Sequence, residues 1–263
     1  MFQSGASTDP RFATFYAGMV EQLPAQARAE RALELAINRF AGAPEYVIQQ
    51  ADSWRGQIKP TDKLGALIDT AINAPLIEVR MAGFELYLAQ FNLEKSAAEV
   101  ERLLGRMRED PEHAGPWALR SLGVMAARGV ERERIYGELL QSTVDADENS
   151  RRWAVDALAK LGGSEIVKPL LSIAVNDVSA VVRERAFCGL AQSGTLLIGE
   201  RYLALPGLLR IAEDPNSTTQ TLSWTFQAMR EISGICDLPE EASVWRAQLG
   251  ESGLLESSAL DVE

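Results

Sequence analysis

Residues 168–191, KPLLSIAVNDVSAVVRERAFCGLA, contain two apolar stripes separated by a short polar loop. In the first stripe Leu170, Leu171 and Ala174 follow one another at helical spacing, and such spacing places side chains on one face of a helix. The second stripe has the same spacing and consists of Val182, Ala186, Gly189 and Leu190. The stretch therefore predicts two helices joined by the loop at residues 175–179.

This two-helix unit recurs along the chain. Moving back by 32 residues brings Arg151 into register with Arg183, and Leu158 into register with Leu190. Further segments in the same register are 79–84, 117–122, 153–158 and 224–229. About five units, spaced by 32 to 39 residues, cover residues 61–234. Because repeats of this length are typical of solenoids, we predict an all-α solenoid of helical hairpins.

The unit resembles the HEAT-repeat family. The matching residues are Pro169, Leu170, Leu171, Asp177, Val182, Arg183, Ala186 and Leu190. The resemblance implies a right-handed superhelix of antiparallel helix pairs, with the second helices along the concave side. It also implies bonds between repeats from a loop acid to a second-helix arginine, here Asp145, Asp177, Arg151 and Arg183. The observed spacing is shorter than the roughly 40–47 residues usual for the family. We therefore expect short, bacterial-type HEAT-like repeats, or another short two-helix repeat.

The pattern divides the chain into four segments. Residues 1–9 are predicted to be a flexible N-terminus, and residues 10–58 a helical cap without the repeat signature. The cap helices are expected at 11–22, 25–40 and 44–54. Residues 59–250 are predicted to form the repeat array, continuous with the cap. Residues 251–263 contain four acids and no base, which indicates a mobile acidic tail.

Composition narrows the class of protein. The formal net charge of −11 disfavours nucleic acid as the partner. No apolar run approaches the roughly 18–20 residues that cross a bilayer, so we expect no membrane span. The first residues, MFQSGASTDPRF, lack the features of a secretory signal, so we expect a cytoplasmic protein.

Charge is distributed unequally between the two helices of each repeat. In the last four repeats the first helices with their loop acids, at 94–110, 131–148, 164–177 and 200–214, hold nine basic and sixteen acidic residues. The second helices, at 116–128, 150–161, 179–193 and 217–233, hold eight basic and three acidic residues. Candidate partner-binding residues on their exposed side are Arg120, Arg152, Asp156, Glu184, Gln227 and Arg230. We expect a mildly basic concave groove that accepts a protein or peptide segment of acidic character, although some of its arginines are also candidates for bridging repeats.

Trp117, Trp153 and Trp224 occupy one equivalent position in three repeats, at the edge of the buried stripe. One interpretation is that each indole fills the seam between neighbouring repeats, because aromatic side chains contribute much of the buried area in proteins. The other interpretation is an aromatic strip along the groove that contacts a ligand. We favour seam filling.

Residues that carry catalytic chemistry are sparse. The single histidine, His113, lies in a predicted loop, where we interpret it as a solvated residue. Cys188 and Cys236 have neither disulfide nor metal-ligand spacing, and we interpret both as small buried hydrophobes. No glycine-rich phosphate loop or His–Glu metal motif occurs. We therefore predict a binding or scaffold protein rather than an enzyme, with no cofactor and no metal.

Two alternatives remain open. Some HEAT-like proteins are DNA-repair glycosylases or tetrapyrrole–protein lyases, and the chain is also compatible with a structural subunit of a larger complex. The excess of acid weighs against DNA repair, and the lack of a reactive Cys or His constellation weighs against a lyase. A resemblance at the level of the repeat does not carry an activity with it.

Overall fold

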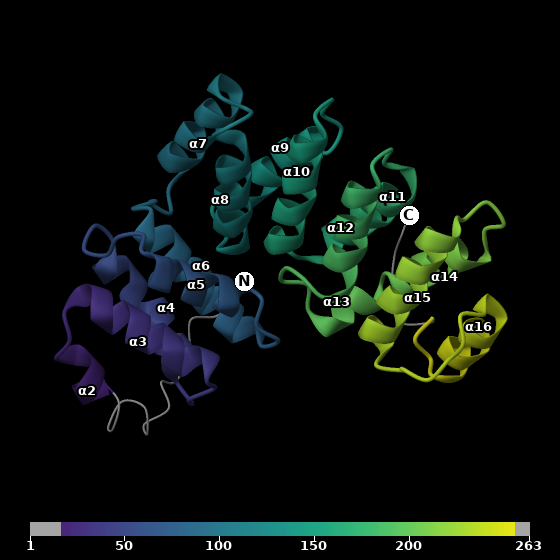
Figure 1. Cartoon of the computed structure of the whole chain (residues 1–263), viewed down its shortest axis with the longest axis horizontal. Helices are drawn as coiled ribbons and strands as arrows, with labels where there is room; N and C mark the ends of the chain where they lie inside the picture. Colours follow the sequence, from purple (N-terminus) through teal and green to yellow (C-terminus); the bar gives the residue numbers. More distant parts are fainter. Residues whose placement is uncertain (1–16, 256–263) are drawn as a thin grey trace. The chain divides into compact units, whose positions relative to one another are not determined.

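The computed structural model describes residues 17–255, and all the regular secondary structure among them is helical. This confirms the predicted all-α class. The predicted flexible N-terminus (1–9) and most of the predicted acidic tail (251–263) lie outside the described residues. The chain divides into two compact units, Met1–Lys95 and Ser96–Glu263, here called unit 1 and unit 2 (Figure 1).

Unit 1 consists of two helix pairs in contact with each other. Its helices are α2 (Ala17–Glu21), α3 (Ala25–Ile37), α4 (Ala43–Trp54), α5 (Asp62–Ile72) and α6 (Ile77–Gln90). Helix α3 packs against α4, α5 packs against α6, and the pairs meet through α3 with α5 and α4 with α6. The core between them contains the fully buried side chains of Leu33, Val47, Trp54, Leu64 and Phe84. The segment predicted as a cap therefore contributes one of these pairs.

Helix α3 is shorter than the predicted helix at 25–40, and its turn explains the difference. Arg39 adopts a left-handed conformation with φ of 61°. The N–H of Phe40 then bonds the carbonyl of Leu35, and the N–H of Arg39 bonds that of Ala36. This pair of bonds is the Schellman arrangement, which ends a helix and is usually formed around glycine. Because arginine is not a residue that usually ends a helix in this way, the sequence did not predict the end of α3 at this turn.

Unit 2 contains four successive helix pairs. Their bounds are α7 (Ala97–Glu109) with α8 (Gly115–Ala127), α9 (Arg132–Ser142) with α10 (Glu148–Leu161), α11 (Val167–Asn176) with α12 (Ala180–Ala191), and α14 (Leu205–Glu213) with α15 (Thr219–Ser233). A 3₁₀ turn (Ser164–Ile166) and the short α13 (Ile198–Tyr202) lie in connections, and α16 (Ala242–Glu251) packs on α14. The second helices also contact one another in the order α8, α10, α12, α15. These four helices are called the second-helix layer below.

Polar side chains fix where the second helices begin. Asp147, Ser179 and Thr218 accept hydrogen bonds from the first-turn N–H groups of α10, α12 and α15. These N–H groups have no partner inside their own helix, so each bond satisfies a donor that the helix leaves free. The loops between paired helices therefore set the register of the second helices.

The second-helix layer depends on small residues at its contacts. A Cβ atom added at Gly123 in α8 would lie 2.6 Å from the carbonyl oxygen and 2.8 Å from the Cα of Ala157 in α10. A Cβ added at Gly189 in α12 would lie 3.2 Å from the Cβ of Ala159, also in α10. Helix α10 is thus approached closely from both sides, because glycine leaves room for its backbone.

The C-terminal end of α10 is held by the next pair and by its own partner helix. Thr195, in the loop after α12, donates its N–H to Ala159 O at 2.9 Å and its hydroxyl to Lys160 O at 2.8 Å. Arg132, at the start of the partner helix α9, donates to Leu161 O at 2.8 Å. The last carbonyls of a helix lack partners within it, so these bonds stabilise α10, and those from Thr195 also join two consecutive pairs.

Among the described residues, no helix is both long enough and apolar enough to cross a bilayer.

Close contact between α8 and α10 predicts the effect of adding one methyl group. Gly123→Ala should lower the free energy of unfolding by about 1–3 kcal/mol, because the added Cβ overlaps the backbone at Ala157. Gly105→Ala in α7 is the matched control, because its Cβ would meet no atom within 4 Å. It should raise stability by up to about 1 kcal/mol through helix propensity. Urea denaturation followed by circular dichroism measures both, and equal effects would contradict the close approach.

Candidate functional site

Charged side chains from three consecutive pairs meet on the second-helix layer. The Nζ atom of Lys160 lies 2.8 Å from Oδ2 of Asp156, one turn earlier on α10. From α12, a guanidinium nitrogen of Arg185 lies 3.8 Å from Oδ1 of Asp156. From α8, Arg120 acts electrostatically on both Asp156 and Lys160. These four residues are called the charged cluster below.

The repeat explains why these side chains meet. Arg120 and Asp156 are 36 residues apart, the distance between equivalent positions of two neighbouring repeats. Asp156 and Lys160 stand four residues apart, so they share a face of α10. Arg185 belongs to the next repeat, one turn before the position equivalent to Asp156. Equivalent positions on adjacent packed helices are neighbours in space, and the cluster follows from that register.

Burial and charge act in opposite directions on the carboxyl group of the cluster. Partial burial of Asp156 works to raise its pKa. Lys160, Arg185 and Arg120 work against burial, and together they hold the pKa of Asp156 below its usual value. Asp156 is therefore an ionised partner of the surrounding cations.

Lys160 is the most enclosed member of the cluster, with 8% of the residue exposed. Its burial lowers the pKa of the ammonium group, and repulsion by Arg120 and Arg185 acts in the same direction. The hydrogen bond and charge of Asp156 oppose that shift without cancelling it. Lys160 thus lies within the electrostatic reach of one attracting carboxylate and two repelling guanidinium groups.

The other predicted binding residues have separate surroundings. Arg152 lies over the ring of Trp153, 4.8 Å from its centroid, and donates to Asn149. Glu184 and Gln227 are exposed. Arg230 is ion-paired at 3.3 Å with Glu240, in the segment between α15 and α16. The structure therefore unites Arg120 and Asp156 in the charged cluster and places Arg230 in a different contact.

Two members of the cluster were not among the predicted binding residues. Lys160 carries a usable signal, since a lysine four residues after an aspartate on a helix forms an ion pair. Arg185 stands at the position that tryptophan occupies in the other repeats, which marks it as an exception. Its distance from Asp156 depends on how α10 and α12 pack, and neither helix alone contains that information.

The three tryptophans of the repeated position are all half-buried. Trp224 in α15 contacts Phe187 in α12, with ring centroids 6.0 Å apart. Trp153 has Arg152 over its ring, as described above. Each indole thus has one part in contact with the protein and another part at the surface, so packing and ligand contact are compatible at this position.

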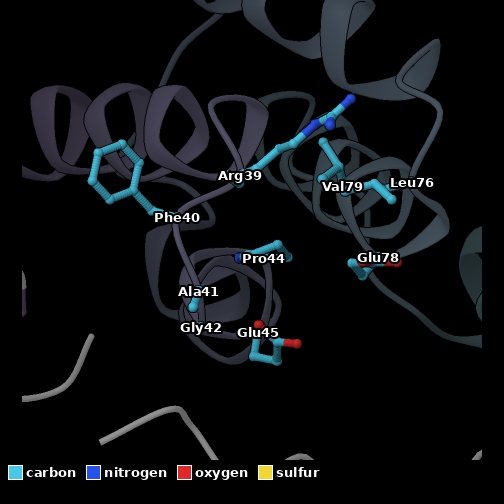
Figure 2. A pocket seen from close by; sticks show the side chains of 10 residues that line it. Arg39, Phe40, Ala41, Gly42, Pro44, Glu45, Leu76, Glu78 and Val79 are labelled. Carbon is cyan, nitrogen blue, oxygen red and sulfur yellow. The ribbon is translucent and has the colours of Figure 1, made fainter. Parts of the chain in front are cut away.

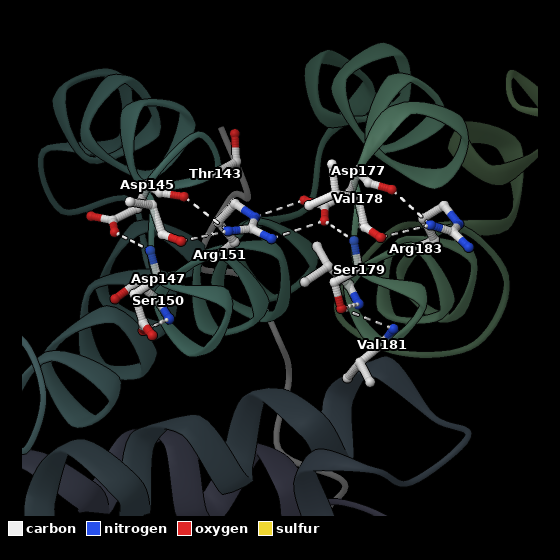
Figure 3. A network of polar contacts seen from close by, with 12 residues as sticks. Thr143, Asp145, Asp147, Ser150, Arg151, Asp177, Val178, Ser179, Val181 and Arg183 are labelled. Carbon is white, nitrogen blue, oxygen red and sulfur yellow. Dashed lines mark hydrogen bonds and ion pairs between the residues drawn. The ribbon is translucent and has the colours of Figure 1, made fainter.

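The residues predicted to join repeats form a polar network at the loop ends of the second helices (Figure 3). Arg151 donates from Nε to one carboxylate oxygen of Asp177 at 2.9 Å and from Nη2 to the other at 3.2 Å. It also donates to the carbonyls of Asp145 and Ala146 in its own loop. Both side chains of the ion pair are at most 10% exposed. A forked, buried bond therefore links the pair α9–α10 to the pair α11–α12.

Arg183 and Asp145 have only part of this arrangement. Arg183 donates to the carbonyls of Asp177 and Val178, as Arg151 does in its own loop. The side chain of Asp145 accepts the N–H of Asp147 and supports its turn. Among the described residues, the expected bond from a second-helix arginine to the loop acid of the next repeat forms once, from Arg151 to Asp177.

The histidine and the two cysteines have separate surroundings in the structure. His113 is exposed beside Asp110, whose hydrogen bond raises the pKa of the imidazole. Cys188 is half-buried, and burial raises the pKa of its thiol. The interpretation of Cys236 as a buried residue is wrong, because Gly234 ends α15 in a left-handed turn and leaves Cys236 in an exposed loop. Within residues 17–255, no His, Cys, Asp and Glu side chains gather in a way that would hold a metal ion.

Unit 1 contains a pocket of about 320 Å³ at the turn between α3 and α4 (Figure 2). Its wall is formed by Ala36, Arg39, Phe40, Ala41, Gly42, Pro44, Glu45, Leu76, Glu78 and Val79. Two of its polar residues, Glu45 and Glu78, lie in the first turns of α4 and α6, where acids stabilise the ends of helices. This role gives both carboxylates a place in the fold, and the lining of the pocket contains no Ser, Thr, Cys, His or Lys side chain.

The ion pair between repeats predicts a specific loss of stability. Asp177→Asn should lower the free energy of unfolding by about 2–3 kcal/mol, because Arg151 stays buried without its counter-charge. Asn keeps an oxygen that can accept the N–H of Ser179, a bond of 2.8 Å in the structure. Asp214→Asn is the control, since Asp214 accepts the N–H of Asn216 at 2.9 Å in the same kind of turn. Denaturant melts should show a change below about 0.5 kcal/mol for the control. Equal losses would assign the effect to the turns and contradict a role for the ion pair.

Comparison with protein-family models and with curated protein sequences gives no match to the chain. Its function is therefore argued from the arrangement of its side chains.

Proposed function

We propose that this chain is a HEAT-like helical-repeat protein that binds an acidic segment of another protein along the second-helix layer. In this proposal it acts as a binding or scaffold protein and not as an enzyme. The observation that carries the proposal is the charged cluster, in which Lys160 and Arg185 contact Asp156 and Arg120 acts on it electrostatically from α8. The succession of helix pairs in unit 2 supports the repeat assignment.

The chemistry of the cluster favours an anionic partner. Lys160 and Arg185 contact one carboxylate, and Arg120 acts on the same carboxylate from α8, so cationic groups of three helices gather at this partly enclosed surface. Guanidinium groups bond two oxygens of a carboxylate at once, so Arg120 and Arg185 are suited to acidic side chains. The protein as a whole has a net charge of −11 and repels polyanions at long range. A short acidic segment that reaches the cluster avoids most of that repulsion.

The geometry of packed helices also suits an extended segment. Neighbouring helices lie about 8–10 Å apart, and an extended chain rises about 3.3 Å per residue. A segment that crosses the second-helix layer therefore advances about three residues from one helix to the next. Acidic residues at every third position of a partner would face successive second helices.

The state of Asp156 argues for binding rather than for catalysis. A general base has to accept a proton near neutral pH, whereas the cations around Asp156 lower its pKa and keep it ionised. Its contacts with Lys160 and Arg185 make it an organiser of the cations. We assign the arginines to the partner and Asp156 to their positioning.

The proposal is tested with a fluorescent peptide of about twelve residues, the length that crosses four helices, with a glutamate at every third position. Binding is measured by fluorescence anisotropy at about 50 and about 300 mM salt. We expect affinity to fall at the higher salt, and Arg120→Glu with Arg185→Glu to weaken binding by about tenfold or more through repulsion.

Two exposed arginines of the first helices provide a control with the same change of charge. Arg106→Glu with Arg210→Glu should change the affinity by less than about threefold, because both lie on the other helices of their pairs. Arg185→Glu alone is used if the first double variant loses its circular dichroism signal, since the Arg185 side chain is 44% exposed. Equal weakening by both double variants, or no binding of the peptide to the unaltered protein, would contradict the proposal.

A further inference from the structure

We propose that the pocket of unit 1 binds a small amino acid with an apolar side chain. This inference is independent of the partner binding proposed above, because every residue that lines the pocket belongs to unit 1. The volume of about 320 Å³ is near the lower end of the range of about 300–1,000 Å³ that is usual for small-molecule sites. The pocket therefore suits a ligand of the size of an amino acid rather than a nucleotide or a large cofactor.

Charged side chains of both signs line the pocket without bonding one another. Arg39 lies in the turn that ends α3, Glu45 in the first turn of α4 and Glu78 in the first turn of α6. Within residues 17–255, none of these three side chains forms a hydrogen bond or an ion pair with the protein. Both kinds of charge are therefore open to a ligand that enters the pocket.

The carboxylate of Glu45 is the group that gains most from a cationic ligand. The residue is half-buried, and its Oε2 atom is buried without a hydrogen-bond partner. Polar atoms that leave water without gaining a new bond are rare in proteins and call for an explanation. Water also screens a partly buried charge less than an exposed one, so Glu45 attracts a nearby cation more strongly than the exposed Glu78. The ammonium group of the ligand binds Glu45, and Glu78 adds to the attraction.

Arg39 supplies the opposite charge at another part of the wall. In Figure 2 its side chain extends past Val79 and away from the carboxylates of Glu45 and Glu78. The side chain is exposed, so it is free to turn toward a bound anion. A guanidinium group bonds both oxygens of a carboxylate at once. An amino acid carries an ammonium group and a carboxylate group, so it matches both parts of the wall, which a simple amine or a simple acid does not.

The wall between the charged groups is apolar. Pro44 and Val79 are buried and Leu76 is half-buried. Figure 2 shows Pro44 and Val79 between Arg39 and the two carboxylates. An apolar side chain of the ligand would cover this surface and release water from it. An apolar wall with a few charged groups that fix the orientation of the ligand is the usual composition of a small-molecule site.

The test compares leucine with 3-methylbutylamine, which lacks its carboxylate, and with 4-methylpentanoate, which lacks its amine. Binding to the full chain is measured by ligand-detected nuclear magnetic resonance. We expect leucine to bind with a Kd of about 1 mM or lower, and about tenfold or more tightly than either of the other compounds.

Two variants remove one charge each from the pocket. Glu45→Gln should weaken the binding of leucine by about tenfold, because the ammonium group loses its anionic partner. Arg39→Gly should weaken leucine by a similar factor without weakening 3-methylbutylamine, and glycine suits the φ of 61° at this turn. Glu133→Gln is the control for the loss of a first-turn glutamate, since Glu133 lies in the first turn of α9 and does not line the pocket.

Each outcome bears directly on the inference. If leucine does not bind at about 10 mM, or if 3-methylbutylamine binds as tightly as leucine, the assignment of an amino acid is overturned. Equal effects of Glu45→Gln and Glu133→Gln would overturn the location in the pocket. Circular dichroism checks the folding of each variant. If Glu45→Gln does not fold, Glu78→Gln takes its place, and it should weaken leucine by about threefold because the residue is exposed.

Discussion

The close approach of α8, α10 and α12 is the constraint on which the rest of unit 2 depends. Gly123 and Gly189 leave room for the backbone and side chains of Ala157 and Ala159, so three second helices pack side by side. Larger residues would force the helices apart or their side chains out of favourable rotamers. Because the helices are close, Arg120, Asp156 and Arg185 interact although they belong to three different pairs. Small residues in the core therefore determine which charges meet at the surface.

Arginines of the second helices serve two purposes according to their position on the helix. Near the loops, Arg151 and Arg183 bond carbonyls of their own turns, and Arg151 also bonds Asp177 of the next pair. Arg120 and Arg185 lie further from the loops, near the middle of α8 and of α12. Both act on Asp156 of α10. The first group consumes its donors within the fold and stabilises it. The second group acts on Asp156 at the second-helix layer, and we assign recognition to it.

Sequence periodicity was sufficient to predict the all-α class and the succession of helix pairs, because apolar residues at helical spacing report which side of each helix is buried. The resemblance of the sequence to a known repeat implied bonds from loop acids to second-helix arginines, and the structure has one such bond, from Arg151 to Asp177. The cluster could be predicted only in part. The pairing of Asp156 with Lys160 is local, whereas the contribution of Arg185 depends on how α12 lies against α10. Cys236 was misplaced because the turn at Gly234 ends α15 before the apolar pattern does.

Three helix pairs bring charged side chains together in the charged cluster, and the titration of Lys160 tests this arrangement most directly. Nuclear magnetic resonance of side-chain-labelled lysines follows each ammonium group separately in the full chain. The structure predicts that Lys160 has a pKa below the usual lysine value, with burial as the main cause and the two arginines adding to it. Arg185→Gln should raise that pKa, because a repelling charge from the neighbouring pair is removed. If Lys160 titrates at the usual lysine value both with and without Arg185, the charges do not meet and the account is contradicted.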